Sequence, residues 1–73
     1  MKIIFSQHAK EQRRKRKIPK GYIIETVTKP EEERKSYRNR RLLRKRLGRK
    51  IMEVVISQEN DIIVVVTQYY LDL

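Results

Sequence analysis

Residues 62–71 read IIVVVTQYYL and contain the longest nearly uninterrupted apolar run of this 73-residue chain. β-Branched and aromatic residues are enriched in strands, so this stretch predicts a buried strand. Its apolar part, Ile62–Val66, is far too short to span a membrane. The 19 lysines and arginines all lie between Lys2 and Lys50, and none follows in the aliphatic part of the chain. The core and the basic surface therefore come from different stretches of the sequence.

Length and composition limit the chain to one small domain, residues 1–73, because a chain of this size buries only about 60% of its unfolded surface and cannot support a second core. There is no cysteine, which excludes disulfides, thiolate zinc sites and cysteine nucleophiles, and a single histidine argues against a metal site. The segment Lys2–Phe5 is too short for the hydrophobic region of a signal peptide. We therefore expect a cytoplasmic protein with no metal, no cofactor and no membrane partner.

The order of apolar patterns and turn residues predicts the topology β-α-α-β-β-β-β. Ser6 is a suitable N-cap for the first helix, and Pro19 and Pro30 bracket the second. The expected elements are a strand at Lys2–Phe5, helices at Gln7–Lys17 and between Ile18 and Pro30, and strands at Arg34–Arg38, Arg41–Leu47, Lys50–Ser57 and Ile62–Leu71. The fold class we expect is α+β, with two N-terminal helices packed on a four- to five-stranded, mainly antiparallel sheet.

Hairpin turns at Asn39-Arg40 and Gly48-Arg49 would set the register of the sheet, and side chains then alternate between its two faces. One face is aliphatic and suits a layer of helices; it collects Leu43, Leu47, Met52, Val54, Ile56, Ile63 and Val65. The other face is apolar in its middle and polar elsewhere; it collects Tyr37, Leu42, Arg44, Arg46, Ile51, Glu53, Val55, Val64, Val66, Gln68 and Tyr70. That mixture is typical of an open, substrate-facing sheet.

The formal net charge is +10, and the cations occur in blocks. Ten of them lie between Arg34 and Lys50 with no carboxylate among them. Such blocks disfavour the compact state by self-repulsion, which favours RNA or the ribosome as a neutralising partner, although a merely solvated face has the same composition. Arginines can also bind phosphates bidentately. The expected RNA-binding residues are Arg38, Arg40, Arg41, Arg44, Lys45, Arg46 and Tyr70.

Metal-free cleavage of RNA needs a base for the 2′-OH proton, an acid for the leaving oxygen and cations for the phosphorane. His8 is the only side chain here that titrates near neutrality unaided, and nearby cations favour its neutral, base-competent form. A phenol beside guanidinium groups can have its pKa lowered, which makes Tyr69 or Tyr70 an acid, base or stacking candidate. Each of these residues also has a purely structural explanation. His8 can be a solvated or hydrogen-bonded histidine, and one of the two tyrosines can belong to the core while the other lies at its rim.

The sequence lacks the motifs that other classes of reaction require. The chain has no glycine-rich phosphate loop, no paired-carboxylate site of obvious spacing and no serine-based elbow, so nucleotide hydrolysis and acyl transfer are disfavoured. The carboxylate run Glu31–Glu33 follows Pro30 and is best explained as a solvated turn that offsets nearby arginines.

Several short motifs, taken in order, resemble one protein family. They are Ser6-x-His8-Ala9, Arg16-Lys17-Ile18, a second helix ending in Lys29-Pro30-Glu31, a basic hairpin, and the run from Ile62 to Tyr69. The chain resembles the small RelE/BrnT-like toxin superfamily, in particular its short members with an N-terminal His-Ala and a C-terminal Val-x-Thr-x-Tyr. Members are known or inferred metal-independent ribonucleases, usually neutralised by an antitoxin encoded alongside.

By position, the resemblance implies that His8, Arg16, Thr67 and Tyr69 belong to a catalytic site on a single RelE-like domain. Such sequences commonly have an arginine and an apolar residue where this chain has Gln12 and Arg13. The function we expect is therefore a metal-independent endoribonuclease toxin of the mRNA interferase type, with RNA or the ribosome and a cognate antitoxin as partners. The alternative is a non-catalytic RNA- or ribosome-binding module on the same fold.

Overall fold

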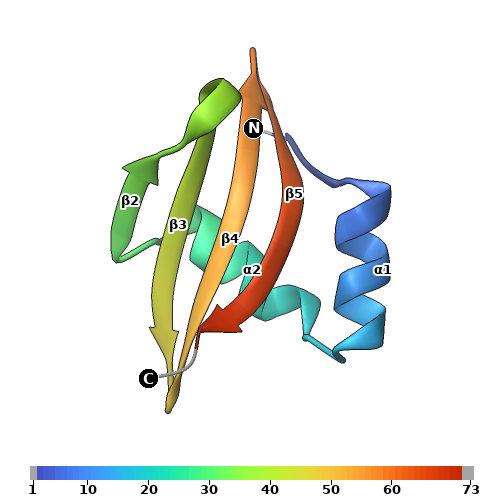
Figure 1. Cartoon of the computed structure of the whole chain (residues 1–73), viewed down its shortest axis with the longest axis vertical. Coiled ribbons are helices and arrows are strands. Elements are labelled where there is room, and N and C mark those ends of the chain that lie inside the picture. The colour runs from blue at the N-terminus through green and yellow to red at the C-terminus, as the bar shows by residue number, and fades with distance from the viewer. Residues whose placement is uncertain (1, 72–73) are drawn as a thin grey trace.

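The aliphatic stretch quoted above forms strand β5 (Ile62–Leu71), which lies inside a five-stranded sheet of order β1-β5-β4-β3-β2 (Figure 1). The structure is a computed structural model and describes residues 2–71. Along the chain, the other elements are β1 (Lys2–Phe5), α1 (Gln7–Lys15), α2 (Lys20–Thr28), β2 (Glu32–Lys35), a 3₁₀ turn (Tyr37–Asn39), β3 (Arg40–Leu47) and β4 (Lys50–Glu59).

The expected fold class is wrong about the sheet and its relation to the helices. The protein is a small α+β fold, but its sheet is mixed: β1 pairs parallel with β5, from Lys2 opposite Ile62 to Phe5 opposite Val65, while the remaining neighbours are antiparallel. A parallel pair needs a long crossover connection, and both helices belong to that crossover. The helices therefore follow the first strand of the sheet. Helix α1 lies along the edge of β5 beyond the end of β1, and α2 lies behind β3 and β4 (Figure 1).

Helix α1 is fixed at its start by Ser6. The Ser6 Oγ accepts a hydrogen bond from the Ala9 N–H at 3.0 Å and donates one to the Val66 carbonyl at 2.8 Å, so the same hydroxyl caps the helix and ties it to β5. The helix ends at Lys15, two residues before the expected end, because Lys17 has a left-handed backbone with φ of 54°. Helix α2 begins after Pro19 and ends before Pro30, as expected.

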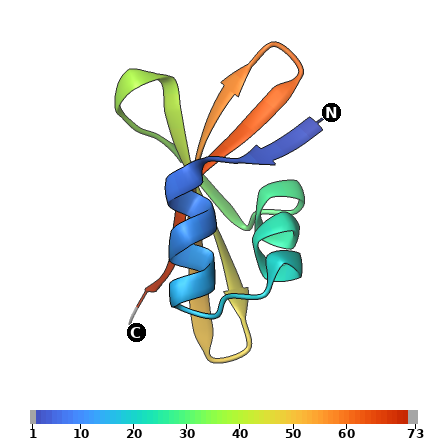
Figure 2. The ribbon, with the colours of Figure 1, turned by 90° about the vertical axis from the view of Figure 1, so that its right-hand side faces the viewer.

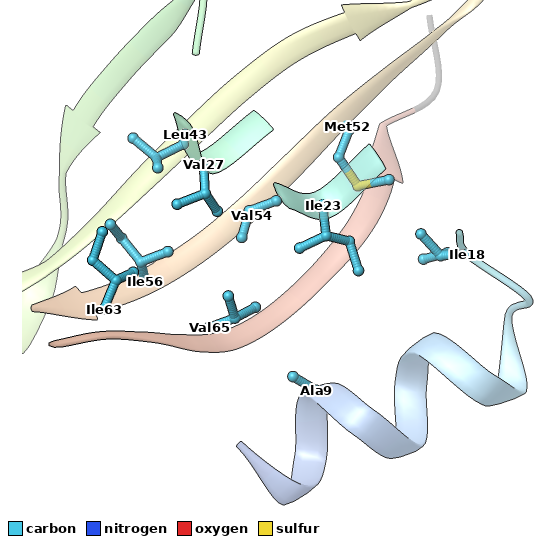
Figure 3. Close-up of a cluster of buried hydrophobic side chains, with 10 residues drawn as sticks. All are labelled: Ala9, Ile18, Ile23, Val27, Leu43, Met52, Val54, Ile56, Ile63 and Val65. Atoms are coloured by element: carbon cyan, nitrogen blue, oxygen red, sulfur yellow. The ribbon is translucent and has the colours of Figure 1, made fainter. Parts of the chain in front are cut away.

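The core lies between α2 and one face of the sheet. Ile23 and Val27 of α2 point toward the sheet, and Ala9 and Ile18 close the core on the α1 side (Figure 3). The residues predicted for the helix-facing side are found there: Leu43, Met52, Val54, Ile56, Ile63 and Val65 are buried, and Leu47 packs against them. Neither helix covers the opposite face of the sheet, which we call the uncovered face (Figure 2).

A β-bulge interrupts the pairing of β4 with β5. Ile56 lies opposite Val65, but its neighbour Val55 lies opposite Thr67, so Val66 is an extra residue in β5. The extra residue reverses the alternation expected for the end of the strand. As a result Gln68 and Tyr70 belong to the helix side, and the expectation that they face outward is wrong.

Contacts of these two side chains agree with that placement. Gln68 is 1% exposed, and its Nε2 donates to the Ala9 carbonyl at 2.9 Å. Tyr70 packs against the core, and the Lys50 ammonium lies 4.6 Å from the centre of its ring. The Tyr69 side chain, one residue away, therefore belongs to the uncovered face.

The expected strand at Arg34–Arg38 is shifted toward the N-terminus. Strand β2 is Glu32–Lys35, and the chain turns at Tyr37–Asn39, where Arg38 and Asn39 have φ of 58° and 61°. A strand cannot continue through two left-handed residues, so Tyr37 stands in the turn. The acidic run contributes to the sheet, because Glu33 pairs with Arg41 at 3.0 Å and Glu32 with Arg44 at 3.3 Å.

Candidate functional site

Four polar residues lie side by side across the uncovered face. Strand pairing places Glu32 opposite Arg44, Arg44 opposite Glu53, and Glu53 opposite Tyr69. Directly opposed residues have their Cβ atoms about 4.5–5.5 Å apart. This distance allows each side chain to form a hydrogen bond or ion pair with the side chain on the next strand. We call this set the Tyr69 row.

The hydrogen bonds of the Tyr69 row converge on Glu53. Its Oε1 accepts from the Arg44 Nε at 2.6 Å, and its Oε2 accepts from the Tyr69 hydroxyl. Arg44 also donates to Glu32 at 3.3 Å. Glu53 is only 4% exposed, and a buried carboxylate is tolerated when both its charge and its oxygens have partners. Glu53 therefore holds Arg44 and Tyr69 in fixed orientations, while the Arg44 side chain keeps a third of its surface open to solvent.

The Tyr69 phenol does not have the lowered pKa that the basic composition suggested. Burial raises the pKa of Tyr69 to about 12, and the hydrogen bond to Glu53 and the charge of that carboxylate act in the same direction. The Arg44 guanidinium opposes the shift but does not cancel it. The phenol is therefore protonated at neutral pH, and it can serve as a proton donor.

This pKa can be checked by titration. The absorbance of the Tyr69 phenolate is the difference between the titration curves of the parent and of Tyr69→Phe. We expect this phenolate to form around pH 12, whereas an ordinary tyrosine has a pKa of 10.0. Because the folded protein holds this proton more tightly than the unfolded chain, the stabilisation from Tyr69 should be complete below pH 10 and lost as the pH rises from 10 to 12. A Tyr69 phenolate forming near pH 10 in the folded protein would show that Glu53 does not hold the phenol.

His8 is held near the same part of β5. It stands between two residues anchored to that strand, because Ser6 bonds to the Val66 carbonyl and the Ala9 carbonyl accepts from Gln68. The His8 side chain is exposed, and within residues 2–71 it forms no hydrogen bond or ion pair. The structure thus brings the His8 main chain beside the Thr67 segment.

The direction of the imidazole follows from the helix geometry. Lys10 and Arg13 line a hollow together with Phe5 and Lys20 on the side of α1 that faces the helix layer. At about 100° per residue, His8 falls on the opposite flank of α1 from these two cations. The imidazole is therefore directed away from that hollow.

The other two residues implied by the resemblance are placed differently. Thr67 is half-buried and lies opposite Val55, in the row next to Glu53 and Tyr69. Arg16 is the C-cap of α1, about 12 Å along the helix axis from His8. Its guanidinium is exposed and donates to Gln12 at 3.4 Å, so the structure does not join Arg16 to the Tyr69 row.

The predicted RNA-binding residues divide between the two sides of the sheet. Because side chains alternate along β3 and Leu43 is buried under α2, Arg40, Arg44 and Arg46 lie on the uncovered face. Arg38 stands in the turn at the rim of that face. The remaining three, Arg41, Lys45 and Tyr70, lie on the helix side. There Lys45 donates to the Lys29 carbonyl at 3.1 Å, and Arg41 is paired with Glu33.

Sequence reasoning assigned no role to Glu53, which is the centre of the row. The signal was present, because a lone carboxylate interrupts the apolar run from Ile51 to Ile56. A charged residue is rarely buried unless it is paired, so its position in a central strand indicates a partner on a neighbouring strand. Which residues pair with Glu53 depends on the register of the strands, and for Tyr69 this register is set by the bulge at Val66.

Comparisons with known proteins point to a family. A family model described as a domain of unknown function, DUF4258, matches residues 5–70, which cover almost the whole described chain. Neither the curated proteins nor the solved structures gave a match. Across residues 2–71, no helix is long and apolar enough to cross a membrane, and no group of three or more histidine, cysteine or carboxylate side chains is arranged to hold a metal ion.

Proposed function

The chain belongs to the DUF4258 family, and we propose that it is a metal-independent endoribonuclease that cleaves RNA by attack of the 2′-OH on the adjacent phosphate. One observation carries the proposal: a buried carboxylate, Glu53, orients a phenol and a guanidinium on a sheet face that no helix covers. Polar groups are organised in this way where charge must be stabilised during a reaction. A set that served only stability could be replaced by apolar residues on the same strands.

Each step of the proposed reaction has a group assigned to it. The Arg44 side chain keeps a third of its surface open to solvent, and it would meet the phosphate and stabilise the charge that builds on its oxygens. His8, whose main chain is held beside the Thr67 segment, would accept the 2′-OH proton. Tyr69 would give its proton to the leaving 5′-oxygen, and Glu53 is a positioning residue that touches both Arg44 and Tyr69.

A phenol with a pKa of about 12 is adequate for this role. The leaving 5′-oxygen departs as an alkoxide, whose conjugate acid is about as weak an acid as water and far weaker than a phenol. Proton transfer from Tyr69 to that oxygen is therefore favourable even though burial and Glu53 raise the pKa of the phenol. The same raised pKa argues against Tyr69 as the base, which leaves that role to His8.

The wider biological role is part of the proposal. Resemblance to the RelE/BrnT-like toxins supports a toxin that acts in the cytoplasm on free or ribosome-bound RNA and is neutralised by an antitoxin encoded beside it. The net charge of +10 supports a polyanionic target. An open reading frame next to this one that encodes a small acidic-tailed or DNA-binding protein would agree with the pairing.

Cleavage in the presence of excess EDTA tests the proposed chemistry. We expect the protein to cut a single-stranded RNA under these conditions and to leave a 2′,3′-cyclic phosphate and a 5′-hydroxyl, because the reaction uses only side chains. The matched substrate, with 2′-deoxyribose throughout, should stay intact since it lacks the nucleophile. Cleavage that needs an added divalent ion, or that proceeds equally on the deoxy substrate, would refute the mechanism.

A non-catalytic RNA-binding module is the second candidate. It is favoured by the hydrogen bond of the Tyr69 hydroxyl to Glu53, because this bond already engages the proton that the enzyme would donate. In that case the protein would bind both oligonucleotides in the EDTA experiment and cut neither.

A further inference from the structure

Tyr37 is an unusually exposed aromatic residue. It is 86% exposed, compared with 46% for Tyr22, the next most exposed large hydrophobic residue among those described. Isolated exposed apolar residues need no explanation in general, but a large ring that is almost fully solvated contributes little to the core. The Tyr69 row and the proposed reaction leave Tyr37 without a role.

The turn that carries Tyr37 is well defined. The Ser36 N–H donates to the Arg40 carbonyl at 2.8 Å, and the Arg40 N–H donates to the Tyr37 carbonyl. Arg38 and Asn39 both have left-handed backbones, which residues other than glycine seldom adopt. The two hydrogen bonds across the turn maintain this conformation. The aromatic ring is therefore presented from a closed turn at the end of a strand pair.

The turn also forms one wall of a hollow on the uncovered side of the sheet. The hollow has a volume of about 550 Å³, and it is lined by Ser36, Tyr37, Arg38, Arg40, Leu42 and Val55. An aromatic ring and two guanidinium groups stand at its rim, the half-buried Leu42 and Val55 form its apolar floor, and no carboxylate lines it. An apolar, flat ligand with negative charge beside it matches these walls.

We propose that this hollow binds an unpaired base of single-stranded RNA, stacked on Tyr37, with Arg38 and Arg40 meeting the phosphates on either side. Unpaired bases stack on exposed aromatic rings, and arginines follow the backbone, in single-strand-binding proteins generally. The inference rests on the proposed function and adds a substrate subsite to it. The hollow lies at a suitable distance from the Tyr69 row. The pair Leu42 and Val55 on its floor is two residues along the same strands from the pair Arg44 and Glu53, which is roughly 7 Å, and both pairs are on the same face. A base in the hollow would therefore lie close to the phosphate at Arg44.

The test uses a fluorescent single-stranded oligonucleotide with 2′-O-methyl riboses throughout, which the protein cannot cut. We expect Tyr37→Ala to weaken binding by roughly 5- to 150-fold, the usual effect of removing one stacking platform, and Tyr37→Phe to bind like the parent because its ring can still stack. Tyr22→Ala is the matched control, since it removes a tyrosine from α2 at the same net charge and should leave affinity unchanged.

Further outcomes decide whether stacking is the cause. Inorganic polyphosphate has charge but no bases, so it should bind the parent and Tyr37→Ala equally. Equal affinity of Tyr37→Ala and the parent for the oligonucleotide, or an equal loss in Tyr22→Ala, would overturn the subsite. Because the probe cannot react, a Tyr37 effect in a protein that cleaves no RNA would keep the subsite and remove the endonuclease proposal. Circular dichroism of each variant separates loss of binding from loss of folding.

Discussion

Tyr69→Phe is expected to lower RNA cleavage by roughly 10²–10⁴-fold while leaving RNA affinity nearly unchanged, because it removes the proton donor and keeps the ring. His8→Ala should lower cleavage by a similar factor. Single-turnover cleavage rates measured beside equilibrium binding give both quantities.

Tyr70→Phe provides the matched control for this experiment. Tyr70 is the adjacent residue and carries the same phenol, but it faces the helix side and packs against the core. Its hydroxyl should therefore be dispensable for cleavage. If Tyr69→Phe and Tyr70→Phe behave alike, or if His8→Ala cleaves like the parent, the assignment of acid and base fails. The non-catalytic module would then be the better account.

RNA affinity is expected to fall by a few hundred-fold when the salt concentration rises from about 50 to about 200 mM. The reason is the release of counterions: if about six phosphates are contacted, each contributes roughly −0.7 to the slope of log affinity against log salt for a single strand. Filter binding at several salt concentrations measures the slope. An affinity that does not respond to salt would remove the phosphate argument on which RNA binding rests.

Arg40 and Arg41 allow the salt effect to be assigned to one face of the sheet. They are neighbours in β3 and carry the same charge, but Arg40 lies on the uncovered face and Arg41 is paired with Glu33 on the helix side. We expect Arg40→Gln to reduce the slope by about one phosphate contact and Arg41→Gln to leave it unchanged. The reverse result would mean that RNA binds on the helix side.

Much of the fold could be predicted because its signals are local. The bounds of β1 and β5 and the cap at Ser6 follow from apolar runs and single turn residues, and all of them are confirmed. The parallel pairing of β1 with β5 could not be predicted, because it depends on which distant strand is left with an open edge. Strand β2 was misplaced for another reason: the turn begins earlier than expected, at the left-handed residues Arg38 and Asn39, so the strand is formed by the carboxylates that precede it.

The candidate site was predicted in part. Of the four residues that the resemblance implied, Tyr69, Thr67 and the main chain of His8 lie along the same part of β5, whereas Arg16 stands apart. Their role in catalysis stays a prediction. The raised pKa of Tyr69 could not be foreseen, because it comes from burial and from Glu53, a residue 16 positions away. Whether the chain belongs with the RelE/BrnT-like toxins stays a prediction.

Because of the bulge at Val66, the number of residues in β5, and not their composition, decides which of the two tyrosines lies on the uncovered face. Two tyrosines follow one another in β5, and a regular ladder would turn Tyr70 to solvent and Tyr69 to the core. One additional residue in the valine run exchanges them. In relatives of this chain, an insertion or deletion of a single residue between Val64 and Thr67 would therefore move the phenol away from Glu53 while net charge and hydropathy stayed almost the same. The number of residues between the Val66 position and the tyrosine therefore decides which side of the sheet the phenol occupies.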